Sequence, residues 1–221
     1  ALVDKISSSI TPLLDEAAAP VDITRATTAI FYSISNTQTG LRGVSFGDSL
    51  IKHVVETLTA EFPRLRTFAT LSPIPGFRAW LSKHAGAMLD RLDDKRRSEL
   101  GRAVGFEPPQ ATHLLGAVDK ALELDAKSPV RQMLLECAAY YLGRELQEGK
   151  PADPVARFHL GNGARVERLN WAGDPSGKGQ KQSYGLMVNY LYDLKRIDKH
   201  RSLLAQGKVP VSGDIDSLCR D

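Results

Sequence analysis

Hydrophobic positions in the first third of the chain change their period twice, and each change predicts a different element. Residues 26–36 are rich in β-branched and aromatic side chains and contain no breaker, which predicts a buried strand. A second short apolar run at 66–72 predicts a parallel partner strand, so that a β-α-β unit is complete. Between them, residues 48–62 repeat apolar positions four apart on one helical face: Leu50, Val54, Leu58 and Phe62.

The middle of the chain, about residues 77–149, has a helical pattern. We expect three or four amphipathic helices there, separated by the proline and glycine signals at 105–110 and 127–129. They would form an insertion or a flanking layer.

Alternation with period two returns at 154–171, where the Gly-Asn-Gly sequence at 161–163 predicts a hairpin turn between two strands. We expect a flexible loop at 173–182, a last strand at 184–194, and a tail with one short helix and a loose end. The whole pattern predicts one domain of mixed α/β (α+β) class, with a sheet flanked by helices.

Composition narrows the class of protein. The chain has 221 residues, of which 42% are hydrophobic and 25% charged, enough for a sizeable core. A net charge of +3, from 29 basic and 26 acidic residues, does not favour a nucleic-acid partner. No apolar run approaches the roughly 20 residues of a membrane-spanning helix, and no signal-peptide pattern opens the chain. We therefore expect no membrane partner and a cytoplasmic location, with Cys137 and Cys219 as reduced thiols.

Ser72 stands in a backbone that two prolines constrain. Pro73 and Pro75 hold the residues before them, Ser72 and Ile74, in extended conformations, so the serine hydroxyl has a defined position. That pattern is typical of a strand being terminated and also of a site being built. The serine alone does not decide between the two.

A glycine-rich turn before the first predicted helix is a candidate anion site. Gly40, Gly43 and Gly47 would let the backbone approach a ligand, and the helix N-terminus offers unpaired amides to a pyrophosphate. The dinucleotide fingerprint is absent, and a simple tight turn is the alternative. Residues 173–179 resemble a phosphate-binding loop around Lys178 but lack its spacing and its Ser or Thr.

His159 is the histidine most suited to chemistry. The other four fall on predicted helices or in the charged tail, whereas His159 lies near a predicted strand end beside a glycine turn. A structural histidine is the alternative. No spacing of metal ligands occurs, so we expect no metal.

Four strings resemble the malonyl-CoA decarboxylase family, and the resemblance covers about residues 26–194. They are "AIFYSISNTQTGLRGVSFGDSLIKHVV", "FATLSPIPGF", "DPVARFHLGNGARVERLNW" and "YGLMVNYLYDL". The resemblance implies a fold like that of the GCN5-related N-acetyltransferases, with the helical insertion (77–149) between the two catalytic motifs. It also implies that residues 1–221 are the catalytic domain, that the family's N-terminal helical oligomerisation domain is absent from this chain, and that the protein is a homo-oligomer.

The resemblance also assigns a ligand to the glycine turn. It implies that the strands on either side of the first helix splay apart around pantetheine, and that the pyrophosphate of coenzyme A sits on the turn. The acyltransferase signature is altered here, since Gly40 and Ser45 stand at its ends around Gly43. The implied malonyl-CoA contacts are Arg42, Gly43, Val44, Ser45, Phe46, Gly47, Asp48, Ile51, Ser72 and His159.

Ser72 and His159 match the family's catalytic serine and histidine. Decarboxylation leaves an enolate on the thioester, which needs a hydrogen-bond donor at the oxyanion and a proton at carbon. We expect His159, with a pKa near neutral, to donate that proton, and Ser72 to orient the malonyl group, although the family's serine is usually given the proton-acceptor role. Tyr190 and Tyr192 would add a hydroxyl or only pack. No cofactor is needed, because the thioester is the electron sink.

Two other functions remain as alternatives. One is an acyl-CoA-dependent acyltransferase that uses the same cleft, and the other is a non-catalytic acyl-CoA-binding module. The second alternative requires Ser72 and His159 to lie far apart, whereas catalysis requires them within about hydrogen-bond reach.

Overall fold

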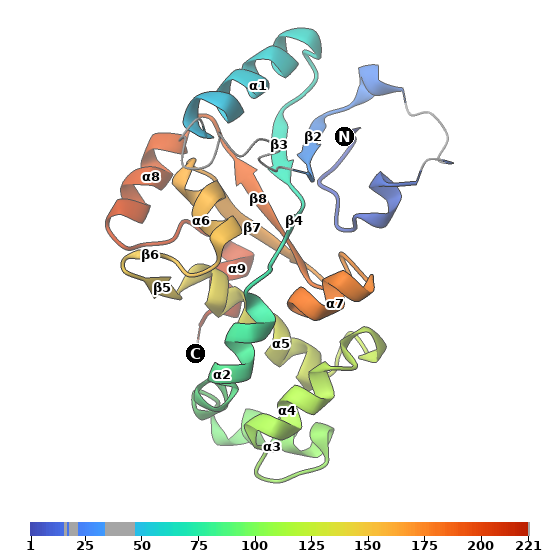
Figure 1. The fold of residues 1–221 in the computed structure, drawn as a ribbon, viewed down its shortest axis with the longest axis vertical. Coiled ribbons are helices and arrows are strands. Elements are labelled where there is room, and N and C mark those ends of the chain that lie inside the picture. Colours follow the sequence, from blue (N-terminus) through green and yellow to red (C-terminus); the bar gives the residue numbers. More distant parts are fainter. Residues whose placement is uncertain (16, 18–21, 34–46, 221) are drawn as a thin grey trace.

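A computed structural model describes residues 1–15, 17, 22–33 and 47–220, with the side chains of 47–50 left out. Within that part of the chain, six strands form one mixed sheet in the order β1-β2-β3-β8-β4, and β7 also pairs with β8. Figure 1 shows α1 above the sheet and α2 to α5 gathered below it. The strands are β1 (Leu2–Val3), β2 (Thr28–Phe31), β3 (Thr67–Thr70), β4 (Ser72–Pro73), β7 (Arg165–Asn170) and β8 (Met187–Tyr192).

The predicted β-α-β unit is confirmed. Strands β2 and β3 pair in parallel from Thr28 opposite Thr67 to Phe31 opposite Thr70, and α1 (Gly47–Glu61) connects them. Strand β8 runs antiparallel to β3 and continues along β4, where Val188 faces Ser72. Ser72 in β4 therefore pairs with β8, the strand that also pairs with β3. Leu71 separates β3 from β4 and belongs to neither strand.

The predicted helical stretch is also confirmed as far as Gly143. A short hairpin of β5 (Leu146–Gln147) and β6 (Lys150–Pro151) follows it. The helices are α2 (Phe77–Asp90), α3 (Asp94–Val104), α4 (Ala111–Val118) and α5 (Pro129–Gly143), with 3-10 turns at Thr11–Leu13, Ile23–Arg25 and Ala121–Glu123.

The predicted hairpin around 161–163 is wrong, because its first arm is the helix α6 (Pro154–Gly161). Asp153 caps this helix by accepting hydrogen bonds from the backbone N–H groups of Val155 and Ala156, and Pro154 occupies the first helical position. Both are strong helix-start signals. The glycines that follow end the helix, and only the second arm, β7, is a strand.

The predicted loop at 173–182 also contains a helix, α7 (Gly177–Ser183), whose N-cap is the side chain of Ser176. The last predicted strand is confirmed as β8. In the tail, α8 (Ile197–Ala205) is the expected short helix, and the segment expected to be loose leads into a second helix, α9 (Gly213–Leu218), capped by Ser212.

Hydrophobic side chains pack on both faces of the sheet. The larger cluster joins the sheet to the helices, with Phe77, Leu134 and Leu160 packed near Val188 in one buried group. A smaller cluster around Ile30 on the other side is covered by the N-terminal segment. Ser72 and strand β8 therefore lie inside the protein, where close packing fixes their side chains.

Candidate active site

Ser72 is a buried residue, 4% exposed, whose hydroxyl is anchored by a neighbouring threonine. Its Oγ donates a hydrogen bond to Thr70 Oγ1 over 2.8 Å. Thr70 Oγ1 in turn accepts the backbone N–H of Tyr190 in β8 at 3.1 Å. The threonine hydroxyl thus takes the place of a backbone carbonyl as the acceptor for the Tyr190 N–H. It also sets the direction of the serine hydroxyl.

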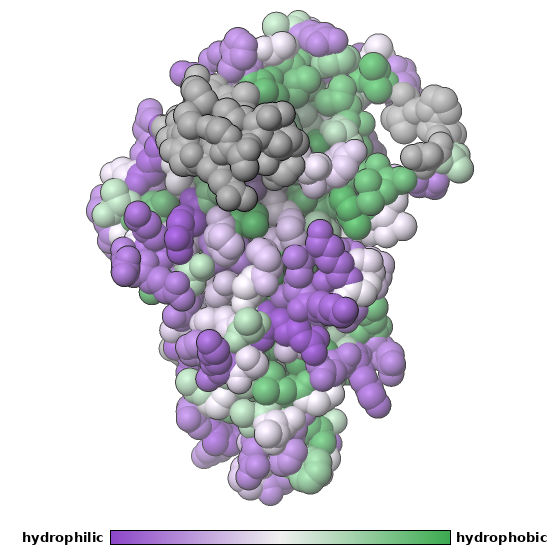
Figure 2. All heavy atoms as spheres, in the orientation of Figure 1, coloured by the Kyte–Doolittle hydropathy of each residue, from purple (hydrophilic) through white to green (hydrophobic). Residues whose placement is uncertain are grey.

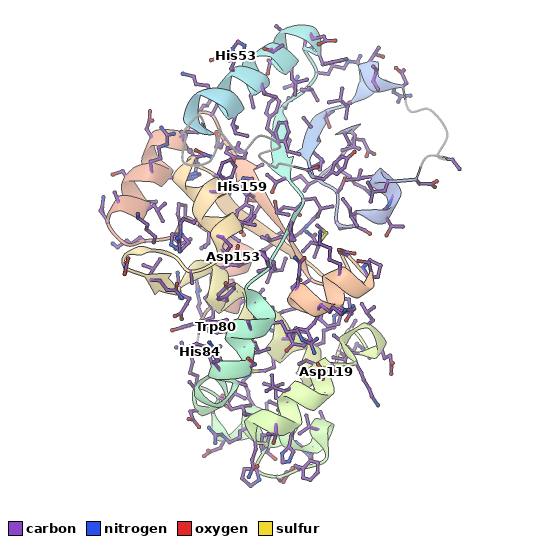
Figure 3. All side chains as sticks on the ribbon, in the orientation of Figure 1. His53, Trp80, His84, Asp119, Asp153 and His159 are labelled. Carbon is purple, nitrogen blue, oxygen red and sulfur yellow. The ribbon has the colours of Figure 1, made fainter. Side chains whose placement is uncertain are left out.

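His159, labelled in Figure 3, lies in the last turn of α6 and is 2% exposed. Its Nε2 is 3.4 Å from Ser72 Oγ, and its Nδ1 is 2.7 Å from the hydroxyl oxygen of Tyr192. The structure therefore brings together two residues that are 87 positions apart in sequence. His159 was expected at a strand end, and its place on a helix is a correction.

The distances are compatible with one direction of donors through the cluster, in the tautomer of His159 that carries its hydrogen on Nε2. Because Ser72 gives its hydrogen to Thr70, its oxygen is left as an acceptor for the Nε2–H of His159. The other ring nitrogen, Nδ1, is then unprotonated and accepts the O–H of Tyr192. In this tautomer a chain of donors runs from Tyr192 through His159 to Ser72 and Thr70.

The charge state of this cluster differs from the expectation. Burial lowers the pKa of His159 to about 3, so the imidazole is neutral near pH 7, and the expected near-neutral pKa is wrong. Burial also raises the pKa of Tyr192 above its ordinary value, which keeps its hydroxyl protonated. The site is a set of neutral donors enclosed in a low dielectric.

The two tyrosines of β8 have different positions. Tyr192 contributes a hydroxyl to the site. Tyr190 packs its ring against the His159 ring, with centroids 4.7 Å apart and an interplanar angle of 27°, and its hydroxyl has no hydrogen-bond partner among the described atoms. Ring contact from Tyr190 fixes the plane of the imidazole.

Comparison with known proteins identifies the family. The family profile described as "Malonyl-CoA decarboxylase C-terminal domain" matches residues 1–221. This chain belongs to that family.

Individual relatives agree with the family match. A protein of Rattus norvegicus named "Malonyl-CoA decarboxylase, mitochondrial" is 37% identical, over 99% of this chain and 46% of its own length. The crystal structure of malonyl-CoA decarboxylase from Cupriavidus metallidurans has a TM-score of 0.85 at 46% identity and covers 99% of this chain and 53% of that one. The crystal structure of malonyl-CoA decarboxylase from Agrobacterium vitis has a TM-score of 0.82 at 42% identity, and the match covers 100% of this chain and 52% of that one. The chain spans about half the length of these malonyl-CoA decarboxylases.

Most of the coenzyme A contacts that the family resemblance implies lie outside the described residues or have no described side chain. Residues 42–46 lie outside the described part of the chain, and Gly47 and Asp48 open α1 without described side chains. Ile51 is buried at 8% exposure. Strands β2 and β3, which the resemblance implies splay apart, stay hydrogen-bonded as far as Leu71 N–H to Phe31 O at 3.0 Å.

Asp153 and Thr70 are site residues that the sequence reasoning missed. The Asp153 carboxylate is fully buried, and burial raises its pKa. One oxygen caps α6, and the other accepts the Gly76 N–H at 3.4 Å and the Tyr141 hydroxyl at 3.5 Å. The Asp-Pro start of a helix and a threonine two residues before Ser72 were the available signals. Among the described residues, no group of three or more metal-ligating side chains gathers anywhere.

Proposed function

We propose that this chain is the catalytic part of a malonyl-CoA decarboxylase, which converts malonyl-CoA to acetyl-CoA and carbon dioxide. The observation that carries the proposal is the approach of His159 Nε2 to Ser72 Oγ, 3.4 Å apart, inside a chain that belongs to this family. That separation supports catalysis over a non-catalytic acyl-CoA-binding module. An acyltransferase would need a base for an acceptor amine, and a histidine whose pKa is about 3 is a weak base.

The first step breaks the bond between the carboxylate carbon and the α-carbon. Carbon dioxide leaves, and the electron pair moves from the α-carbon into the thioester carbonyl, which becomes an enolate oxygen. A neutral imidazole N–H is suited to stabilise this oxyanion, because a fixed donor in a buried site needs no reorganisation as the charge develops. In this step His159 offers Nε2–H, and Ser72 holds the malonyl group in the orientation that favours cleavage.

The second step delivers a proton to the α-carbon. His159 gives up its Nε2 proton to carbon while Nδ1 takes the proton of Tyr192, whose oxygen lies 2.7 Å away. The resulting tyrosinate regains a proton from solvent, so the net reaction consumes one proton. Transfer through both nitrogens places the transient negative charge on Tyr192 instead of on an imidazolate, and because burial raises the pKa of Tyr192, the tyrosinate is short-lived.

The other features of the proposal concern the whole protein. We infer that residues 42–48 and Ile51 hold coenzyme A, with Ser72 and His159 at the malonyl end, and that the domain has the fold of the GCN5-related N-acetyltransferases. Homo-oligomerisation, a cytoplasmic location and a reaction without a cofactor also remain predictions. In the part of the chain described here, no helix has the length and apolar character to span a membrane.

Acetyl-CoA formation from malonyl-CoA, followed by mass spectrometry, tests the proposal in the full-length protein that contains this chain. We expect Ser72→Ala and His159→Ala each to abolish most turnover while coenzyme A still binds. If the parent protein binds coenzyme A but releases no acetyl-CoA, the decarboxylase proposal is wrong.

A further inference from the structure

A cavity lined by charged side chains lies away from Ser72 and His159. Its volume is about 690 Å³, and it is bounded by the end of α5, the start of β7, the helix α8 and the segment 207–213. Neither proposed catalytic residue lines it. Figure 2 shows hydrophilic side chains along the edge of the molecule where Figure 1 places α8.

Positive side chains dominate the lining of this cavity. The only carboxylate that lines it among the described residues is Asp216, which pairs with Arg144 at 2.8 Å and with Arg220 at 2.9 Å. Two further arginines are paired with carboxylates just outside it. The five cationic side chains are Arg144, Arg165, Arg196, Lys199 and Lys208.

The two lysines are the unneutralised charges. Neither Lys199 nor Lys208 has an ion pair or a side-chain hydrogen bond within the described part of the chain. Four separate segments of the chain thus bring an excess of positive charge to one concave surface. Such a surface focuses an electric field that attracts anions.

A buried histidine adds a polar group to the same wall. His200 is 4% exposed and donates its Nδ1–H to the backbone oxygen of Gly163 at 2.9 Å. Its Nε2 has no partner among the described residues, although His200 lines the cavity. Because Nδ1 carries the ring hydrogen, Nε2 is an acceptor to which a ligand hydroxyl or a bridging water can donate.

We propose that this cavity binds a small molecule that carries a pyrophosphate group, at a site separate from the one that holds the substrate. Lysine ammonium groups bind phosphate oxygens as point charges, and N–H groups that the arginines do not use in their ion pairs add further donors. The volume is in the range of about 300–1,000 Å³ that is usual for small-molecule sites. This goes beyond the proposed decarboxylation, which does not use any of these residues.

Calorimetric titration of the full-length protein with inorganic pyrophosphate tests this site. With saturating coenzyme A filling the substrate site, we expect one pyrophosphate to bind per chain, and the Lys199→Gln, Lys208→Gln double variant to bind it at least tenfold more weakly. The matched control is Lys95→Gln, Lys120→Gln, which removes the same charge from exposed positions outside the cavity and should stay within about twofold of the parent.

Saturating coenzyme A distinguishes the cavity from the substrate site, where residues 42–48 would also accept a pyrophosphate group. We expect one pyrophosphate still to bind per chain when coenzyme A fills the substrate site, because the sites are separate. Loss of all pyrophosphate binding under saturating coenzyme A would overturn the proposal, since the cavity would then belong to the substrate. Absence of binding to the parent, or equal weakening in the control variant, would overturn it as well. All of these readouts are independent of turnover, so they stand even where the decarboxylase proposal fails.

Discussion

Replacing His159 with glutamine removes from the buried site a group that is forced to stay uncharged in the folded protein. Burial lowers its pKa from 6.5 to about 3. In the unfolded chain the imidazole takes up a proton near pH 6.5, whereas the folded protein does not until near pH 3. The unfolded state therefore binds more protons between these two values, and the stability that is fully present above pH 6.5 falls as the pH is lowered.

The size of the effect follows from the two pKa values. Between pH 7 and pH 5, protonation of the unfolded imidazole lowers the free energy of unfolding by about 2 kcal/mol, since each unit of pKa is worth about 1.4 kcal/mol. Glutamine is polar and does not titrate. We expect His159→Gln to lose about 2 kcal/mol less than the parent protein over the same pH interval, because all other titratable groups are shared.

Urea unfolding at pH 7 and pH 5, for parent and variant, measures this double difference. Equal pH dependence in the two proteins would refute the reasoning, because it would mean that His159 titrates normally in the folded state. A second measurement bears on the same point. The value of kcat/KM, which reports pKa values of the free enzyme, should show no descending limb near pH 6.5 that belongs to His159.

Three further perturbations test the neighbours of this histidine. Tyr192→Phe removes the donor to the imidazole Nδ1, and steady-state kinetics should show kcat lowered by about 10²-fold or more with KM little changed; an unaltered kcat would contradict the proton relay. Thr70→Val leaves a buried hydroxyl and a buried backbone N–H without their acceptor, and urea unfolding should show a loss of about 1–3 kcal/mol, whereas a neutral effect would mean that water replaces it. Gly76→Ala places a methyl group against the Tyr141 hydroxyl and should destabilise by about 1–3 kcal/mol; adding Tyr141→Phe should recover part of that loss, and strictly additive effects would show that the contact is not the cause.

The hydrophobic pattern of the sequence predicted those helices and strands whose period is long and regular. The β-α-β unit and the helices of 77–143 have long, regular periods, and the structure contains them. The helix α6 was missed because Gly161 and Gly163 flank a residue typical of hairpin turns, and this signal was given more weight than the Asp153-Pro154 start. Period alone does not separate an eight-residue helix from a short strand.

The candidate site could be predicted only in part. Spacing along the chain does not say that Ser72 and His159 meet, and the pairing came from family resemblance. The hydrogen bond from Ser72 to Thr70 forms because β3 ends at Thr70 and β4 begins at Ser72, with Leu71 between them. No local sequence pattern shows this interruption. The low pKa of His159 follows from its burial by α6 and β8, and burial is a property of the assembled fold.

Asp153 explains how a long helical stretch can separate the two halves of the site without disturbing it. The stretch begins just after Gly76 and ends just before Asp153, and one carboxylate oxygen joins these two points by accepting the Gly76 N–H. The chain therefore leaves the sheet and returns to it at adjoining positions. Since the same carboxylate caps α6, the entry of the helices, the exit of the helices and the helix that carries His159 share one buried anchor. Changes within α3 or α4 can then alter the outer surface while the distance from Ser72 to His159 is kept.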